Sequence, residues 1–420
     1  MLDKYQNIIQ KTNYTFFIAL VCALPFPTRF SLYAWGGWIV TWLLEGRYLH
    51  KENIIWKKGL IPIIGITILL IWEAISYIWA IDKIDASNAL GRHLSYIALP
   101  PISIWGVNNQ YDWKKIAKWF VISCIASIFI YGIYLHIIQF WKYIYTTHQI
   151  PAPVLSWEWF GYHISPIKHR LYYANILNLG IIALWLIRPW KSSTHHYKKI
   201  RIVFFVVALL ILITGIAWSG SRSNILVLIA IGGIAIIQSL QKRARILVSL
   251  ATCIIGTMLV ALVFKVHPRF ESLDLTHILE RASYPTEQIE PRINIWYAAL
   301  QNPKDYIWHG VGVGCNTEYL KSIYTSLQWD HFYERGYNTH NQYLGILINL
   351  GIFAAIFFLL IWLLYPLWYN GKTKHIATLI VITIGSNMLT ENILDRIDGV
   401  IVTCVSMLTI VLIYRAQLSK

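Results

Sequence analysis

Long apolar blocks alternate with shorter polar connections along most of the 420-residue chain. A helix needs roughly 20 apolar residues to cross a hydrocarbon core of about 30 Å, and the chain contains twelve candidate blocks. They lie near 13–27, 30–45, 59–80, 92–107, 117–140, 171–189, 200–219, 223–241, 246–265, 341–369, 375–393 and 399–415. Helices are the expected spanning elements because each satisfies its own backbone hydrogen bonds in lipid. We therefore predict an all-α polytopic membrane protein with about twelve transmembrane helices.

Two polar connections are too long to be simple turns. The first, about 141–170, is rich in Trp and Tyr, which commonly form a belt at the membrane surface and also stack on sugars. The second, 265–340, is the most polar stretch and is long enough to form a subdomain. We expect nine transmembrane helices in 1–264, this loop subdomain, and three more helices in 341–420.

The composition excludes a soluble protein and explains the positive charge. Charged residues make up 13% of the chain, against about a quarter in soluble domains. The net charge is +16, and most of the 36 Lys and Arg residues fall in connections that share a side with both termini. The positive-inside rule makes that side cytoplasmic, so the charge reports topology and gives little support to nucleic-acid binding. The first apolar block lacks a small-residue cleavage site, so we expect an uncleaved first helix.

The first candidate for chemistry is a tight turn around Arg222 between two apolar blocks. An arginine at this depth is costly unless it is paired, serves a site, or extends to the headgroups. The hydroxyl groups around it, including Ser221, together with Gly220, favour an anion-binding turn. Both interpretations of Arg222, as a ligand-binding residue and as a headgroup contact, remain open.

The second candidate is Arg292, which follows Pro291 at the predicted start of a short helix carrying Trp296. A helix N-terminus attracts phosphate, and a guanidinium group adds bidentate hydrogen bonds. The alternative is an ordinary surface arginine. A Gly-x-Gly-x-Gly turn centred on Gly312 follows, and its spacing does not fit a dinucleotide fingerprint. We interpret this turn as one that lets the backbone approach a ligand.

The third candidate is His340, which is flanked by Thr339 and Asn341 at the mouth of a predicted span. A histidine there is either a structural hydrogen-bonding residue or a base that titrates near neutral pH. Gly351 is expected about three turns further along the same membrane helix. The clearest carboxylates within the predicted spans are Glu73 and Glu391, too few for a proton-coupled pump. Metal-ligand spacing is absent from the outward loops, so we predict no metal and no cofactor.

These motifs, in this order, resemble the O-antigen ligase and O-antigen polymerase superfamily. The resemblance covers about 170–400, while the first 140 residues agree only in hydropathy. It rests on Arg222-x-x-x-Leu226, Arg292-x-x-x-Trp296, the glycine turn, His340 with Gly351, and the segment from Thr390-Glu391-Asn392 to Arg396-Ile-Asp398-Gly399.

The resemblance implies a GT-C-like membrane glycosyltransferase in the bacterial inner membrane, with both termini cytoplasmic and the active site periplasmic. The donor would be a glycan on undecaprenyl diphosphate, and the acceptor would be the lipid A–core oligosaccharide. Arg222 and Arg292 would hold the diphosphate, and His340 would deprotonate or orient the acceptor hydroxyl for an inverting, metal-independent transfer. Further substrate contacts are expected from Ser221, Asn341, Arg170, Trp296, Tyr337 and Gly312.

Three other functions compete with an O-antigen ligase. An O-antigen polymerase shares the motifs and uses a second lipid-linked unit as acceptor. A protein O-oligosaccharyltransferase usually carries an additional C-terminal region, which we do not find after the last span. A lipid or polysaccharide transporter predicts internal symmetry and polar residues at the membrane midplane, and the sequence has neither. The single dominant outward loop late in the chain favours the ligase.

Overall fold

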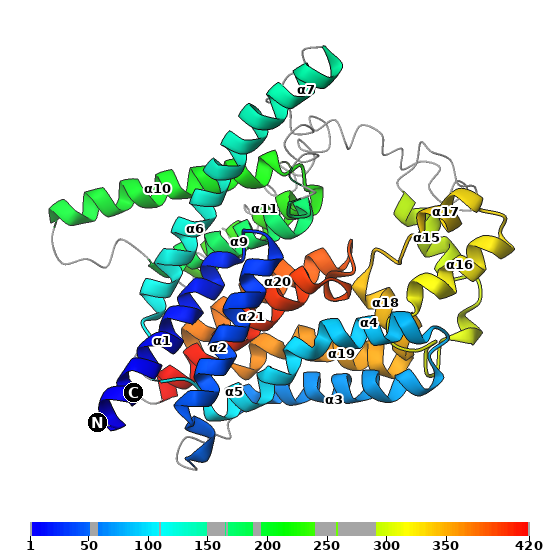
Figure 1. Ribbon diagram of the computed structural model, residues 1–420, viewed down its shortest axis with the longest axis horizontal. Coiled ribbons are helices and arrows are strands. Elements are labelled where there is room, and N and C mark those ends of the chain that lie inside the picture. Colours follow the sequence, from blue (N-terminus) through cyan, green and yellow to red (C-terminus); the bar gives the residue numbers. More distant parts are fainter. Residues whose placement is uncertain are drawn as a thin grey trace.

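The computed structural model describes residues 2–50, 58–108, 111–148, 164, 167–187, 195–239, 258 and 291–418. Within these ranges every regular element is a helix, as predicted (Figure 1). The chain begins with α1 (Leu2–Ala23), α2 (Thr28–Glu45), α3 (Ile61–Ser76), α4 (Lys83–His93), α5 (Leu99–Trp105), α6 (Trp113–Ile133) and α7 (Phe140–Thr147). It continues with α9 (Arg170–Ile187), α10 (His195–Trp218), α11 (Arg222–Ser239), α15 (Pro291–Ala299), α16 (Asn316–Ser326) and α17 (Asp330–Arg335). The last four helices are α18 (Gln342–Leu350), α19 (Ile352–Leu364), α20 (Gly371–Met388) and α21 (Ile397–Leu418).

Five of the described helical segments are long and apolar enough to cross a membrane. They are Ile61–Trp79, Trp113–Ile133, Arg170–Ile187, Lys199–Trp218 and Ile397–Leu418. The chain is therefore a multi-pass membrane protein. The predicted total of twelve spans and the GT-C assignment remain predictions, and the block near 246–265 lies outside the described residues.

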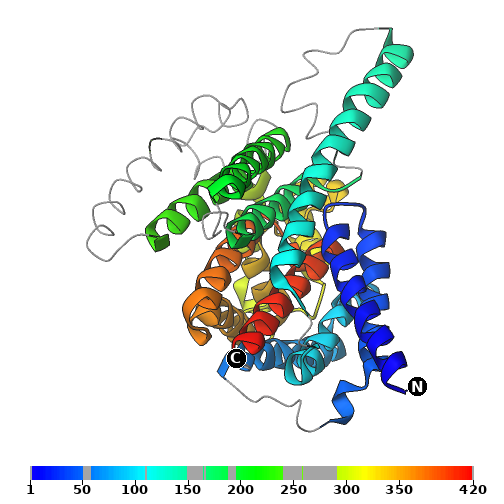
Figure 2. The same cartoon turned by 90° about the vertical axis from the view of Figure 1, so that its left-hand side faces the viewer.

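The helices divide into a buried centre and an apolar outer surface. In the spans of α9 and α21, 72% of the residues are buried, whereas only 28% are buried in the span that contains α3 and 22% in that of α10, as in helices that contact lipid. Around this centre, α9 packs on α6, α10 and α20, and α20 also packs on α11. Both termini lie at one end of the bundle, and α15, α16 and α17 lie at the opposite end (Figures 1 and 2).

The block expected to span near 92–107 is divided, which corrects the sequence prediction. Its first residues end α4, a 3-10 segment covers Leu94–Ala98, and α5 begins at Leu99 with proline in its first turn. Proline lacks the N–H group that would continue the preceding helix. The seven residues of α5 extend only about 10 Å, which is too short for a crossing by itself.

The block near 341–369 is also not one helix. Gly351 separates α18 from α19 with φ of +84°, a backbone conformation that favours glycine. A Cβ atom there would lie 2.3 Å from the carbonyl oxygen of Trp308, and Ile352 N donates to Ile307 O at 2.7 Å. At Gly351, residues of the outer loop therefore contact the break between α18 and α19. The prediction that Gly351 lies further along the same helix as His340 is wrong.

The predicted connection at 141–170 begins as helix. A π-helical turn at Tyr134–Gln139 joins α6 to α7, so the helix runs on past the end predicted for the span. The prolines and aromatic residues of 151–162, on which the belt and sugar-stacking interpretations rest, lie outside the described residues.

The described part of the long loop is a small helical subdomain. Pro291 is the first residue of α15, as predicted, and α16 and α17 follow. Tyr324, Trp329 and Phe332 pack on one another at ring-centroid distances of 5.4–6.3 Å and form its aromatic core. This subdomain places Arg292 and His340 at its two ends.

Candidate active site

The segment that follows α20 contacts the elements of all three predicted catalytic residues. We call Asn387–Asn392, the end of α20 and the first residues after it, the 387–392 segment. It lies between the last two long helices, and a 3-10 turn at Ile393–Asp395 connects it to α21. At the level of side chains, it contacts the α11 N-terminus, Arg292 and His340 in turn.

Arg222 is the first residue of α11, and the polar residues next to it fix this helix end in place. The tight turn before it is made by Gly220, whose φ is +63°. Ser223 Oγ donates to Asn387 Oδ1 at 3.0 Å, and Asn387 Nδ2 donates to Asn224 Oδ1 at 3.0 Å. The N-terminus of α11 is thereby attached to the first residue of the 387–392 segment.

The same helix end is also tied to α9. Asn178 Nδ2 donates to Asn224 Oδ1 at 3.1 Å, and Asn224 Nδ2 donates to Ser221 Oγ at 2.9 Å. Ser221 is buried, so its hydroxyl serves this internal network. Every member of the Asn178–Asn224–Asn387 network is buried, and its amide hydrogen bonds connect α9, α11 and α20.

Arg292 reaches the 387–392 segment from the outer loop. It is the second residue of α15, and its Nε donates to Thr390 O at 3.0 Å. On the same helix, Trp296 Nε1 donates to Thr339 O at 2.9 Å. The indole N–H of Trp296 is thus used to dock α15 onto the residue that precedes His340.

His340 pairs with Glu391 of the 387–392 segment. His340 Nδ1 lies 3.2 Å from Glu391 Oε2; the histidine side chain is 25% exposed, and the carboxylate is buried. A proton on Nδ1 donates to the carboxylate and leaves Nε2 as an acceptor, the tautomer that a general base requires. The ring of Tyr337 lies 6.1 Å from that of His340.

Electrostatics keep Glu391 charged. Burial on its own raises the pKa of this carboxyl, but the hydrogen bond to His340 and the charges of His340, His169 and Arg396 outweigh burial and lower the pKa. The ionised carboxylate therefore persists at neutral pH and fixes the orientation of the imidazole.

Asn392 holds the turn that carries His340. Its Oδ1 accepts from Thr339 Oγ1 at 2.8 Å and from Asn341 N at 2.7 Å. Between these two anchors, His340 has φ of +43°, a conformation that non-glycine residues adopt only when their surroundings enforce it. The side chain of Asn341 caps α18 by accepting from Leu344 N at 3.1 Å.

Positive charge gathers at this end of the bundle. Burial, together with the positive charges of Arg396, Arg170 and His340, lowers the pKa of His169 to about 4, against the opposing effect of Glu391. His169 is therefore neutral at pH 7. Arg170 begins α9 beside it, so this predicted substrate contact lies within electrostatic range of the same groups.

Gly312 differs from the prediction, because the close approach that its missing side chain permits is to the protein itself. A Cβ atom at Gly312, whose φ is +104°, would lie 2.3 Å from Ala80 Cα. Its N–H donates to Asn349 O at 3.0 Å, and the neighbouring Val311 N donates to Ile348 O at 2.9 Å. The glycine turn therefore anchors the outer loop to the end of α18.

Sequence reasoning missed Asn387 as the residue that joins the α11 N-terminus to the site. Asn392 appeared only as part of the Thr390-Glu391-Asn392 segment on which the family resemblance rests, and no role was assigned to it. No sequence pattern pointed to Asn387, because a single amide in an apolar helix has no distinctive pattern.

Comparison with protein families bears on residues 207–359, which match the family described as O-Antigen ligase. The match includes Arg222, Arg292 and His340 and ends before the 387–392 segment. No curated protein matches the chain. The family is one of glycosyltransferase-like enzymes of the ligase or polymerase type. The match over residues 207–359 therefore supports the resemblance to the O-antigen ligase superfamily that the motifs predict.

Proposed function

We propose that the protein is an O-antigen ligase that transfers a glycan from undecaprenyl diphosphate to the lipid A–core oligosaccharide at the periplasmic face of the inner membrane. The observation that carries the proposal is the convergence on the 387–392 segment. Ser223 beside Arg222, Arg292 itself and His340 contact Asn387, Thr390 and Glu391 respectively.

The donor diphosphate would bind between Arg222 and Arg292. Arg222 stands at a helix N-terminus, where unpaired N–H groups and the helix dipole attract phosphate. Guanidinium groups add bidentate hydrogen bonds and stabilise the charge that develops on the leaving diphosphate. A lipid-linked diphosphate would reach such a site from the bilayer without leaving it.

His340 would act as the base. Its Nε2 would take the proton of the acceptor hydroxyl while Nδ1 donates to Glu391. The hydroxyl oxygen would form a bond to the anomeric carbon on the face opposite the diphosphate. The bond between that carbon and the diphosphate oxygen would break, so that the diphosphate leaves with the electron pair and the configuration inverts.

Purified protein in lipid nanodiscs tests the proposal with a radiolabelled glycan on undecaprenyl diphosphate and with lipid A–core as acceptor. We expect label to move onto lipid A–core with wild type and to stay on the donor with His340→Ala. Label that moves only onto another lipid-linked chain would identify a polymerase instead. Label that stays on the donor, and reaches neither lipid A–core nor another lipid-linked chain, would overturn glycosyl transfer altogether.

A further inference from the structure

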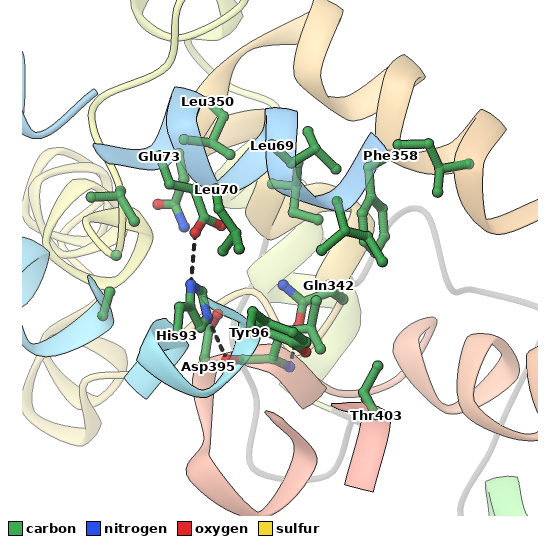
Figure 3. A pocket seen from close by; sticks show the side chains of 18 of the residues that line it. Leu69, Leu70, Glu73, His93, Tyr96, Gln342, Leu350, Phe358, Asp395 and Thr403 are labelled. Atoms are coloured by element: carbon green, nitrogen blue, oxygen red, sulfur yellow. Dashed lines mark hydrogen bonds and ion pairs between the residues drawn. The ribbon is translucent and has the colours of Figure 1, made fainter. Parts of the chain in front are cut away.

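The described part of the chain contains a second glutamate–histidine pair besides His340 and Glu391, and the sequence motifs do not link its two residues. Glu73 belongs to α3 and His93 is the last residue of α4. His93 Nδ1 lies 2.8 Å from Glu73 Oε2 (Figure 3). His93 Nε2 lies 2.9 Å from Leu394 O. Both side chains are largely buried, with 10% of His93 and 15% of Glu73 exposed.

The partners of His93 fix how many protons the pair carries. A carboxylate and a backbone carbonyl are both acceptors, so a neutral imidazole can satisfy only one of them. Both contacts are hydrogen bonds if the imidazole is doubly protonated, or if Glu73 carries the proton and donates it to Nδ1. Either way the pair is electrically neutral and holds one proton more than a neutral histidine beside a carboxylate. With both nitrogens occupied, His93 cannot serve as a base.

The carbonyl that His93 holds belongs to the turn directly after the 387–392 segment. The N–H of the same residue, Leu394, donates to Gln342 Oε1 at 2.6 Å. Gln342 is the first residue of α18, two residues after His340. Both backbone groups of Leu394 are therefore held: its carbonyl contacts His93 and its N–H donates to Gln342. We call these two contacts the double grip, and they set the position of the neighbouring residues Glu391 and Asn392.

The surroundings make the pair sensitive to the loss of either partner. It lines a cavity of about 60 Å³ whose wall is mostly apolar, including Leu69, Leu70 and Phe358 (Figure 3). In such surroundings an unpaired buried charge is strongly unfavourable, whereas a neutral hydrogen-bonded replacement of similar shape is tolerated. The charged and titratable groups that face the pair are Asp395 and Tyr96.

We propose that Glu73 and His93 are positioning residues for glycosyl transfer, holding the Leu394 carbonyl so that Glu391 meets His340 in the reactive orientation. The inference rests on the proposed function, because it concerns the same site. A pair that served only to hold α3 on α4 would have no need of the contact from His93 Nε2 to Leu394.

Glu73→Leu and Glu73→Gln test this inference in the nanodisc transfer reaction. In Glu73→Gln, the amide N–H can donate to Nδ1 of a neutral imidazole whose Nε2–H still donates to Leu394 O, so both contacts survive. Glu73→Leu removes the partner of Nδ1. We expect Glu73→Leu to lower kcat on the order of 10-fold, with KM for the donor unchanged, and Glu73→Gln to stay near wild type.

Ser76→Ala is the matched structural control. Ser76 lies one turn further along α3 and accepts from Val313 N at 3.0 Å, but it makes no contact with Leu394 among its hydrogen bonds in the described chain. We expect its kcat to equal that of wild type, even if its thermal stability falls. Folded Glu73→Leu with a wild-type kcat, or Glu73→Gln as slow as Glu73→Leu, would overturn the positioning role.

Gln342→Ala keeps the inference testable if Glu73→Leu does not fold. It removes the acceptor of the Leu394 N–H and leaves the Glu73–His93 pair intact. We expect it also to lower kcat at constant donor KM. An unchanged kcat in Gln342→Ala would contradict the double grip. If wild type itself transfers no glycan, the proposed function fails, and that result differs from every outcome that concerns Glu73.

Discussion

Two glutamate–histidine pairs in the described part of the chain differ in what the second ring nitrogen of the histidine contacts. In both pairs Nδ1 faces a glutamate oxygen, at 3.2 Å in Glu391–His340 and 2.8 Å in Glu73–His93. His93 also uses Nε2, on Leu394 O. His340 Nε2 makes no hydrogen bond to any described residue, and its side chain is more exposed than that of His93.

In the proposed mechanism, this difference separates a histidine that acts as a base from a histidine that positions its neighbours. A ring nitrogen with a permanent partner has no capacity left to take a proton, while one directed into an accessible site does. The means of restraint differ accordingly. His93 is fixed by its own two hydrogen bonds, whereas His340 is fixed by one carboxylate and by the backbone turn that Asn392 holds.

The largest expected effect comes from replacing His340, whose Nε2 has no hydrogen-bond partner among the described residues. His340→Ala should lower kcat by about 10²- to 10⁴-fold, because a positioned base contributes about that much. Folding and membrane insertion should be retained, since the described hydrogen bonds of the turn run through Thr339 and Asn341. Single-turnover transfer in nanodiscs measures the effect, and near-normal turnover would remove His340 from the chemistry.

Arg222→Lys tests one of the two arginines that we propose hold the donor diphosphate. Lysine keeps the charge but loses the bidentate geometry, so we expect kcat to fall by about 10²-fold and donor affinity to weaken. Arg335→Lys, on the exposed face of α17, is the matched control and should behave as wild type. Unaltered donor affinity in Arg222→Lys, measured by donor titration, would reduce Arg222 to a structural role.

Glu391→Gln sharpens the comparison of the two pairs, because it gives His340 a neutral amide in place of the carboxylate partner. The amide oxygen can still accept from Nδ1, but it stabilises the imidazolium less, so we expect a loss on the order of 10-fold in kcat. Donor KM should not change, because the substitution lies behind the imidazole. A loss as large as that of His340→Ala would mean that Glu391 takes part in proton transfer itself.

Asn392→Ala tests whether the backbone turn holds His340. It leaves the Asn341 N–H without its acceptor, at about 1–3 kcal/mol for an unsatisfied group, while the Thr339 hydroxyl can still donate to Asn341 O at 3.0 Å. We expect a lower melting temperature together with a reduced kcat. Reduced stability at a wild-type kcat would show that the turn supports the fold without orienting the histidine.

The smallest expected effect is the response of stability to pH. Because the folded pKa of Glu391 lies below its usual value of 4.5, its charge stabilises the fold above pH 4.5, and that contribution is lost as the pH falls through the folded pKa. The melting-temperature difference between wild type and Glu391→Gln should therefore be constant from pH 7 to about pH 5 and shrink at lower pH. A difference that already disappears near pH 6 would contradict the charged state of Glu391.

Local sequence signals predicted the helical class and singled out the candidate site residues, but they did not predict how these residues meet. Apolar block length located the five described segments that are long enough to span a membrane, and proline at position 291 located the start of α15. The contact of His340 with Glu391 joins residues 51 positions apart, and that of Ser223 with Asn387 joins residues 164 apart. No periodicity encodes such pairings.

The glycines show the same limit. Gly312 and Gly351 both have positive φ, which a glycine-rich sequence can suggest. Whether the space beside them receives a ligand or another part of the chain depends on tertiary packing, and here Ala80 and Trp308 fill it. The resemblance to the O-antigen ligase superfamily supplied a prediction that local patterns could not, namely that three distant motifs belong to one site.

The most direct test of the central claim is an experimental structure with an undecaprenyl diphosphate-linked glycan bound. We predict that the diphosphate lies between Arg222 and Arg292, and that the first sugar faces Nε2 of His340 while Nδ1 remains on Glu391. A diphosphate bound elsewhere, or a His340 whose Nε2 is turned away from the sugar, would contradict the account.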